Sequence, residues 1–160
     1  MNYNECPAYQ LLESFCQSYS TRNITNLTNL FTKNPIFQFE CNSSTKSMDC
    51  HTLSDIRKEF LESWKKSEKS QLSLASILEN SVPKGSRTIA YFRYIKKDTN
   101  GLFHLAHLKG TLICKNEDSL WHIAELRFVP AIYGKDVYHF FKNIFNTNIK
   151  TSHKKIRESR

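Results

Sequence analysis

The N-terminal third of the chain carries two stripes of hydrophobic residues at helical spacing. The first stripe predicts a helix over residues 8–20, and its members are Leu11, Leu12, Phe15, Cys16 and Tyr19. After a polar break at 21–23, hydrophobic residues again recur every three to four positions. This pattern predicts a shorter second helix that ends near Lys33, because Pro35 cannot continue it.

The following segment changes to extended character and then back to a helical pattern. Residues 35–41 are short and aromatic, which favours a strand, and the polar residues 42–52 predict a loop. Either Thr52 or Ser54 can cap a third helix that ends around Lys66, since Asp55 and Glu59 place negative charge in its first turns. The buried face of this helix is predicted to consist of Ile56, Phe60, Leu61 and Trp64.

From Ser70 onward hydrophobic and polar positions alternate, which is the period of β-strands. Four strands are predicted, at 70–80, 87–97, 102–115 and 119–129. Turn signals at 100–101 and 115–118 make consecutive strands antiparallel neighbours. In the last hairpin, facing Cys114 with Leu120 gives one nearly apolar face. The other pairs on that face are Leu112–His122, Gly110–Ala124, Leu108–Leu126 and Ala106–Phe128.

The C-terminal region combines a hydrophobic stripe with a basic end. Residues 137–149 have helical spacing behind Asp136, a predicted N-cap. Residues 150–160 hold five basic residues and one acidic residue, so they contribute +4 of the net charge of +8. We expect one domain over 1–149, with a C-terminal helix from about 136, and a flexible basic tail over 150–160. Contact of this tail with nucleic acid or membrane stays an alternative that we do not favour, because basic chain ends exposed to solvent are common.

Composition narrows the class of protein. With 39% hydrophobic and 24% charged residues and only four glycines and four prolines, the chain is neither collagen-like nor largely disordered. No stretch approaches the roughly 20 apolar residues of a membrane-spanning helix. The five cysteines form no CxxC pair, and the first ten residues lack the pattern of a signal peptide. We therefore expect reduced thiols and a cytoplasmic location.

The order helix, helix, short strand, helix and antiparallel meander is an α+β plan in which helices cover one face of a sheet. Three segments resemble the nuclear transport factor 2-like superfamily: NLTNLFTKNPIFQF its second helix and first strand, TLSDIRKEFLESW its third helix, and SLWHIAELRFV its last strand. The resemblance covers residues 8–130. It implies a curved antiparallel sheet of five or six strands that forms a cone with three N-terminal helices, and the predicted C-terminal helix adds to this plan.

This superfamily includes SnoaL-like polyketide cyclases and ketosteroid isomerase, whose enzymes work in a pocket between the helices and the concave face of the sheet. With the hairpin register above, the corresponding pocket in this chain is apolar. Its expected ligand-binding residues are Phe15, Tyr19, Trp64, Leu108, Leu112, His122, Leu126 and Phe128.

The candidate catalytic residues are His122, Tyr19 and Glu40. An imidazole on an apolar face can act as a general base or acid near neutral pH, and a tyrosine hydroxyl can donate a hydrogen bond. A histidine hydrogen-bonded at the end of the sheet and a core tyrosine are the simpler interpretations. The ketosteroid isomerase pattern, with a carboxylate base at the end of the first strand, is not matched: Phe39 stands there, and Glu40 follows on the opposite side.

The first functional hypothesis is a non-catalytic cone protein that binds a small apolar ligand or a protein partner, as a homodimer. One alternative is a SnoaL-like enzyme that performs proton-transfer, cyclisation or hydration chemistry on a hydrophobic small molecule. Another is an adaptor that acts through the C-terminal helix and the basic tail. We expect no cofactor and no metal, since Cys41, Cys50 and His51 form only a triplet and no phosphate-binding loop is present.

Overall fold

A computed structural model describes residues 7–40, 47–78 and 87–131. The chain divides into two units, 1–130 and 131–160, and all the helices and strands described here belong to the first. They are α1 (Pro7–Ser20), α2 (Ile24–Asn29), β1 (Phe31–Phe39), β2 (Met48–Cys50), α3 (Leu53–Lys65), β3 (Ser67–Ile77), β4 (Thr88–Asp98), β5 (Phe103–Glu117) and β6 (Leu120–Pro130). The predicted C-terminal helix and basic tail lie outside the described residues. None of the described helices is long and apolar enough to cross a membrane.

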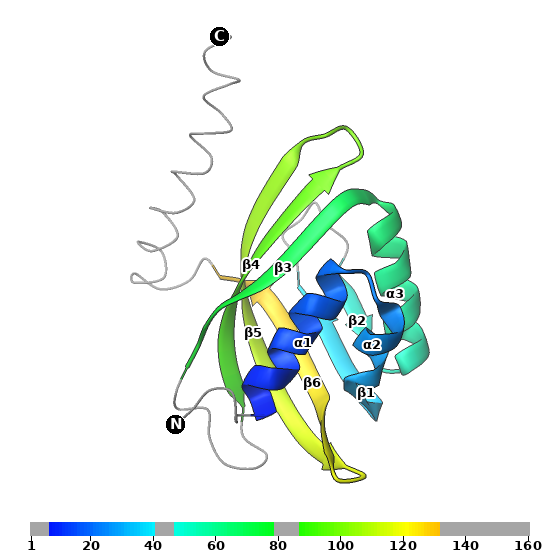
Figure 1. Ribbon diagram of the computed structural model, residues 1–160, viewed down its shortest axis with the longest axis vertical. Coiled ribbons are helices and arrows are strands. Elements are labelled where there is room, and N and C mark those ends of the chain that lie inside the picture. The colour runs from blue at the N-terminus through cyan, green and yellow to red at the C-terminus, as the bar shows by residue number, and fades with distance from the viewer. Residues whose placement is uncertain (1–6, 41–46, 79–86, 132–160) are drawn as a thin grey trace. The chain divides into compact units, whose positions relative to one another are not determined.

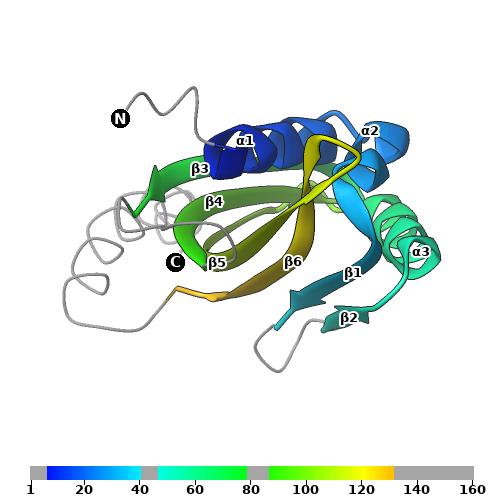
Figure 2. The same ribbon diagram turned by 90° about the horizontal axis from the view of Figure 1, so that it is seen from below.

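The strands form one sheet in the order β2-β1-β6-β5-β4-β3 (Figure 1). All neighbouring strands are antiparallel except β1 and β6, which run parallel. The sheet curves, and α1 and α3 pack against one side of it, which we call the inner face (Figure 2). The opposite side is the outer face. The predicted α+β class and the expectation of five or six strands are confirmed, while the expectation of a purely antiparallel sheet is wrong for the β1–β6 pair.

The N-terminal helices follow the predicted stripes, with one correction. Thr52 is the N-cap of α3, and its side-chain oxygen accepts a hydrogen bond from the backbone N–H of Asp55 at 3.0 Å. However, α2 ends at Asn29, four residues before the predicted end at Lys33. The chain turns extended there because Phe31 is buried and pairs with β6 instead of continuing the helix. The short strand β2 lies in a segment predicted to be a loop.

The β5–β6 hairpin has a different register from the predicted one. The structure pairs Leu112 with Leu126 and Gly110 with Phe128, four residues further along β6 than expected. The strands are joined by a two-residue turn at Asp118 and Ser119, with φ angles of 53° and 66°, so both strands reach further toward the turn. Positive φ at both central residues is the type I′ geometry that suits the twist of a hairpin.

A β-bulge lies in this hairpin next to the turn. The pairing advances from Ile113–Glu125 to Cys114–Ile123, so Ala124 is the extra residue of β6. On the turn side of the bulge His122 pairs with Lys115, whereas Ile123 is fully buried. The prediction that His122 and Ala124 lie with Leu112 on the apolar face is therefore wrong.

Gly110 sits where two aromatic rings approach the sheet. A Cβ atom at this position would lie 2.6 Å from Cε2 of Phe92 and 3.2 Å from Cε1 of Phe128. We expect Gly110→Ala to lower the free energy of unfolding by about 1–3 kcal/mol, because both rings are held in a packed core. Urea denaturation measures this loss.

Phe92→Leu in the same background is the control. If the clash with Phe92 is the cause, Gly110→Ala costs less in the Phe92→Leu protein than in the wild type. Equal costs in both backgrounds would contradict the steric explanation.

Candidate functional site

The inner face is built around a cluster of aromatic rings. The centroid of the Phe15 ring lies 5.9 to 6.2 Å from those of four other rings, which are Phe31, Phe37, Phe60 and Phe128. These separations are typical of favourable aromatic pairs. Leu108, Leu112 and Leu126 are buried in the same core. The structure thus brings together seven of the eight residues predicted to line the pocket: Phe15, Tyr19, Trp64, Leu108, Leu112, Leu126 and Phe128.

Polar side-chain atoms enter this core at the end formed by α1, α3, β3 and β4. The hydroxyl of Tyr19 donates a hydrogen bond to that of Tyr94 at 3.2 Å, and the Tyr19 ring lies 5.8 Å from that of Trp64. Ser70 is on the inner face of β3, two residues from Leu72, the residue that pairs with Tyr94. Both Nε1 of Trp64 and Oγ of Ser70 are buried and have no hydrogen-bond partner among the described residues.

Such orphan atoms are uncommon, because buried polar groups in native proteins are nearly always hydrogen-bonded. Sequence reasoning found Tyr19 and Trp64 through their helical stripes but missed Ser70 and Tyr94. The period-two pattern of β3 was the available signal for Ser70, since it places Ser70 on the same face as Leu72.

The other two candidate catalytic residues lie elsewhere. His122 pairs with Lys115 across the hairpin, and its Nδ1 lies 3.0 Å from the backbone oxygen of Leu120, within hydrogen-bond distance. The Glu40 side chain is exposed, while its backbone N–H donates to the carbonyl of Phe128 at 2.9 Å. The described residues therefore bring neither group to the hydroxyls of Tyr19 and Tyr94.

The chemistry of the buried groups is limited. Burial and the nearby Glu13 raise the pKa of the Cys16 thiol, and burial is also the main cause that raises the pKa of Cys50 to about 11. Both thiols are therefore protonated at neutral pH and are poor nucleophiles. Within the described ranges no carboxylate is buried, and no three metal-ligating side chains are grouped.

One histidine on the outer face has a strongly shifted pKa. His107 is 9% exposed and pairs with Arg93 across β4 and β5. Burial is the main cause that lowers the pKa of His107 to about 4, and the positive charge of Arg93 adds to the effect. His107 is thus neutral at physiological pH, so it is unsuited to serve as a general base near pH 7.

Comparison with known proteins identifies the fold. No protein-family model and no curated protein sequence matches the chain. Among solved structures it is similar to a hexachlorocyclohexane dehydrochlorinase, with a TM-score of 0.65 and 9% identity over 78% of this chain and 82% of that one. A ketosteroid isomerase-like protein from Erwinia carotovora matches with a TM-score of 0.61 and 6% identity, over 80% of this chain and 96% of that one.

A nuclear transport factor 2-like protein of unknown function from Exiguobacterium matches with a TM-score of 0.58 and 14% identity, over 75% and 97% of the two chains. The chain therefore has the nuclear transport factor 2-like fold, which confirms the resemblance seen in the sequence. Identities this low establish the fold alone.

The orphan hydroxyl of Ser70 gives a stability prediction. We expect Ser70→Ala to raise the free energy of unfolding by about 1 kcal/mol, because the substitution removes a buried polar group that has no partner in the described part of the chain. Ser20→Ala is the matched control, since the Ser20 hydroxyl donates to the carbonyl of Leu72 and accepts from its N–H. This control should lose about 1–2 kcal/mol. A destabilised Ser70→Ala protein in urea denaturation would show that the hydroxyl has a partner.

The pKa of His107 predicts how stability depends on pH. The folded-state pKa near 4 lies below the ordinary value of 6.5, so protons bind the unfolded chain more readily between these values. The contribution of His107 is complete above about pH 6.5 and is lost as the pH falls toward 4, by about 2–3 kcal/mol.

Denaturation of His107→Gln should show a smaller loss of stability over this pH window. His122→Gln is the control for replacing a histidine of this sheet. If His107→Gln follows the wild-type pH profile, another group controls the acid response.

Proposed function

We propose that this protein is a non-catalytic binding protein with the nuclear transport factor 2-like fold. Its ligand would be a small, largely apolar molecule that carries one hydrogen-bond acceptor. The binding site would lie at the polar end of the aromatic cluster, beside Tyr19, Trp64, Ser70 and Tyr94.

The observation that carries this proposal is the pair of orphan polar atoms in an aromatic core. The indole Nε1–H of Trp64 is only a donor, so its missing partner must be an acceptor. The Ser70 hydroxyl can donate to the same ligand or accept from it. A ligand with a carbonyl or ether oxygen on an apolar body would satisfy these atoms and stack on the surrounding rings.

The route to this site passes the rim of the cluster. Tyr94 is half-buried, whereas Trp64 is 4% exposed. The hydrogen bond that holds Tyr94 to Tyr19 joins two neutral hydroxyls at 3.2 Å, and a bond of this kind contributes only about 1 kcal/mol. Rotation of Tyr94 would break this bond and the ring contact with Tyr19, whose centroids lie 6.1 Å apart, and would open the core to a ligand.

The same geometry supports binding over catalysis. General acid–base chemistry needs a group whose pKa lies near the working pH, within hydrogen-bond reach of the substrate. The polar side chains at this end of the core include two phenols, an indole, the Ser70 hydroxyl and Lys96, which pairs with Ser70 across β3 and β4. Among the described residues no carboxylate is buried in this core to act as a base. His122, the residue first considered for this role, lies in the β5–β6 hairpin at Lys115.

The two tryptophans allow a direct test by NMR. Acetophenone serves as the probe, because it is a small aromatic molecule with one carbonyl acceptor. In ¹H–¹⁵N spectra we expect its addition to shift the indole signal of Trp64 but not that of Trp121, which lies in β6 away from the proposed site. Trp64→Phe assigns the signal and should weaken binding about fivefold, the value of one hydrogen bond.

Ethylbenzene, which lacks the carbonyl, is the matched ligand control. It should bind more weakly than acetophenone and leave the Trp64 indole proton without a hydrogen-bond shift. If acetophenone moves neither indole signal, or moves both equally, this site is not a ligand site.

A further inference from the structure

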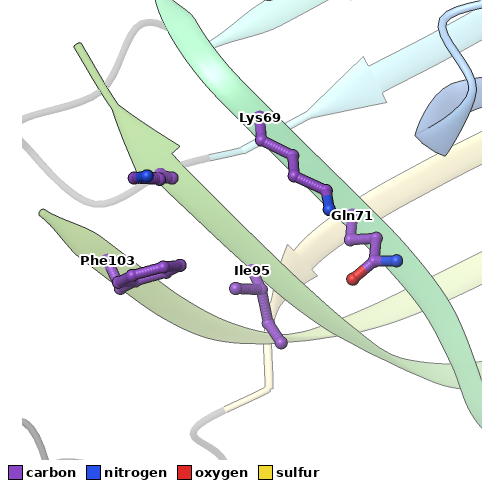
Figure 3. Close-up of a pocket in the computed structure, with 5 residues that line it drawn as sticks. Lys69, Gln71, Ile95 and Phe103 are labelled. Atoms are coloured by element: carbon purple, nitrogen blue, oxygen red, sulfur yellow. The ribbon is translucent and has the colours of Figure 1, made fainter. Parts of the chain in front are cut away.

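The outer face carries a small hollow that is separate from the aromatic core. Its lining residues come from three adjacent strands: Lys69 and Gln71 from β3, Ile95 and Lys97 from β4, and Phe103 from β5. Figure 3 shows the side chains of Lys69, Gln71, Ile95 and Phe103 gathered on this side of the sheet. The hollow has a volume of about 90 Å³, which is close to that of one aliphatic side chain.

Two exposed hydrophobic side chains line this hollow, and a third lies in the adjacent turn. Only five large hydrophobic side chains are exposed in the described ranges, and three of them belong to β4, β5 and the turn between them. These are Ile95, Leu102 and Phe103, which are 36%, 57% and 66% exposed. A cluster of exposed hydrophobic residues on a soluble domain marks an interaction surface more often than scattered ones do.

The charge around the hollow is positive. Lys69 and Lys97 are cross-strand neighbours, and Arg93 and Lys109 lie further along the same face of β4 and β5. The nearest acidic partner is Glu68, whose carboxylate lies 3.4 Å from the ammonium of Lys97. Lys97 also lies 5.8 Å from the centroid of the Phe103 ring. At the hollow itself Lys69 and Lys97 face one carboxylate, and Arg93, two residues from Ile95, raises the local excess from one positive charge to two. The carboxylate of Asp98, next to Lys97, binds His104 and the backbone of the β4–β5 turn instead.

We propose that this hollow is the docking site for an acidic segment of another protein, in which one apolar side chain is flanked by aspartate or glutamate. The apolar side chain would enter between Ile95 and Phe103, and the carboxylates would pair with Lys69 and Lys97. This complementarity favours both fast association and the correct orientation of the segment.

Two other candidate occupants of the hollow are themselves positively charged and would be repelled by its lysines. A second copy of the chain brings an identical excess on this face and a net charge of +8. Residues 132–160 of the same chain hold seven basic and two acidic residues, a net charge of +5. Like charges brought together at an interface cost binding free energy, so an acidic partner fits this face best.

A single-stranded nucleic acid fits less well. Such ligands are bound by several exposed aromatic rings, on which successive bases stack, and by a groove that follows the phosphates. Among the outer-face residues described here, Phe103 is the one highly exposed ring, and Tyr91 is half-buried. The hollow therefore matches a single side chain better than a run of bases.

The test uses the full chain and a fluorescent peptide with a central leucine between two acidic blocks. We expect anisotropy to show binding that weakens as salt is added, and Lys69→Glu to weaken it about tenfold. Lys58→Glu is the matched control, because this exposed lysine on α3 makes the same change in net charge away from the hollow. Its affinity should stay within about twofold of the wild type.

The hydrophobic part of the site is tested in parallel. Phe103→Ser should also weaken binding about tenfold, whereas Leu120→Ser, which alters a side chain of equal exposure at the β5–β6 turn, should not. A peptide with serine in place of the central leucine should bind more weakly than the original peptide.

Three results would overturn the proposal. The first is no binding of the acidic peptide at low salt, or equal binding of the leucine and serine peptides. The second is tighter, Lys69-dependent binding of a single-stranded oligonucleotide. The third is a wild-type dimer that Phe103→Ser converts to a monomer, which would assign the face to a second copy. None of these readouts depends on the Trp64 site, so the two proposals fail independently.

Discussion

The two-residue turn at Asp118–Ser119 and the bulge at Ala124 together decide which side chains of β6 enter the core. If the pairing set by the turn, Glu117 with Leu120, continued without the bulge, Leu112 would face Glu125 and Gly110 would face Arg127. Two charges would then point into an aromatic core, at a cost of several kcal/mol each. The single extra residue moves Leu126 and Phe128 to those positions, and both are at most 2% exposed. The hydrophobic layer beneath α1 and α3 exists because of this one-residue correction.

This hydrophobic layer determines where on the inner face a ligand could bind. In this chain, rings from α1, α3, β1, β4 and β6 lie in mutual contact across the inner face, and Gly110 is the gap into which Phe92 and Phe128 fit. Space for a ligand among these described rings would then come from movement of a ring. The end at Tyr19 and Tyr94 is the part of the core where polar atoms are present and the covering side chain is half-exposed. Binding at this end would separate Tyr94 from Tyr19 and leave the ring contacts of Phe15 in place.

The sequence predicted which side chains of β5 and β6 share a face better than it predicted which residues pair. Leu108, Leu112, Leu126 and Phe128 lie on the predicted face even though their partners are wrong, because a shift of four residues preserves alternation. Beyond the bulge the shift is three residues, an odd number, so His122 was assigned to the wrong face. The positive φ angles of Asp118 and Ser119 form the two-residue turn that sets the pairing. Neither residue is glycine, which would indicate positive φ at this turn. The pairing of Tyr19 with Tyr94 spans 75 residues, beyond the reach of any local pattern.

Strand β3 connects the two proposed sites and also limits how a partner can bind. It is an edge strand, and exposed edges invite the addition of another strand. Here the end of α1 occupies part of that edge: Ser20 takes up both the N–H and the carbonyl of Leu72, and the Arg22 guanidinium donates to the carbonyl of Ser67 at 3.0 Å. With this backbone engaged, an extended segment cannot pair along these residues of β3 and must bind through side chains. The alternation of β3 supplies them on both sides, since Lys69 and Gln71 point outward to the hollow while Ser70 between them points into the core. A ligand that moves Ser70 would therefore also move the strand that carries Lys69 and Gln71.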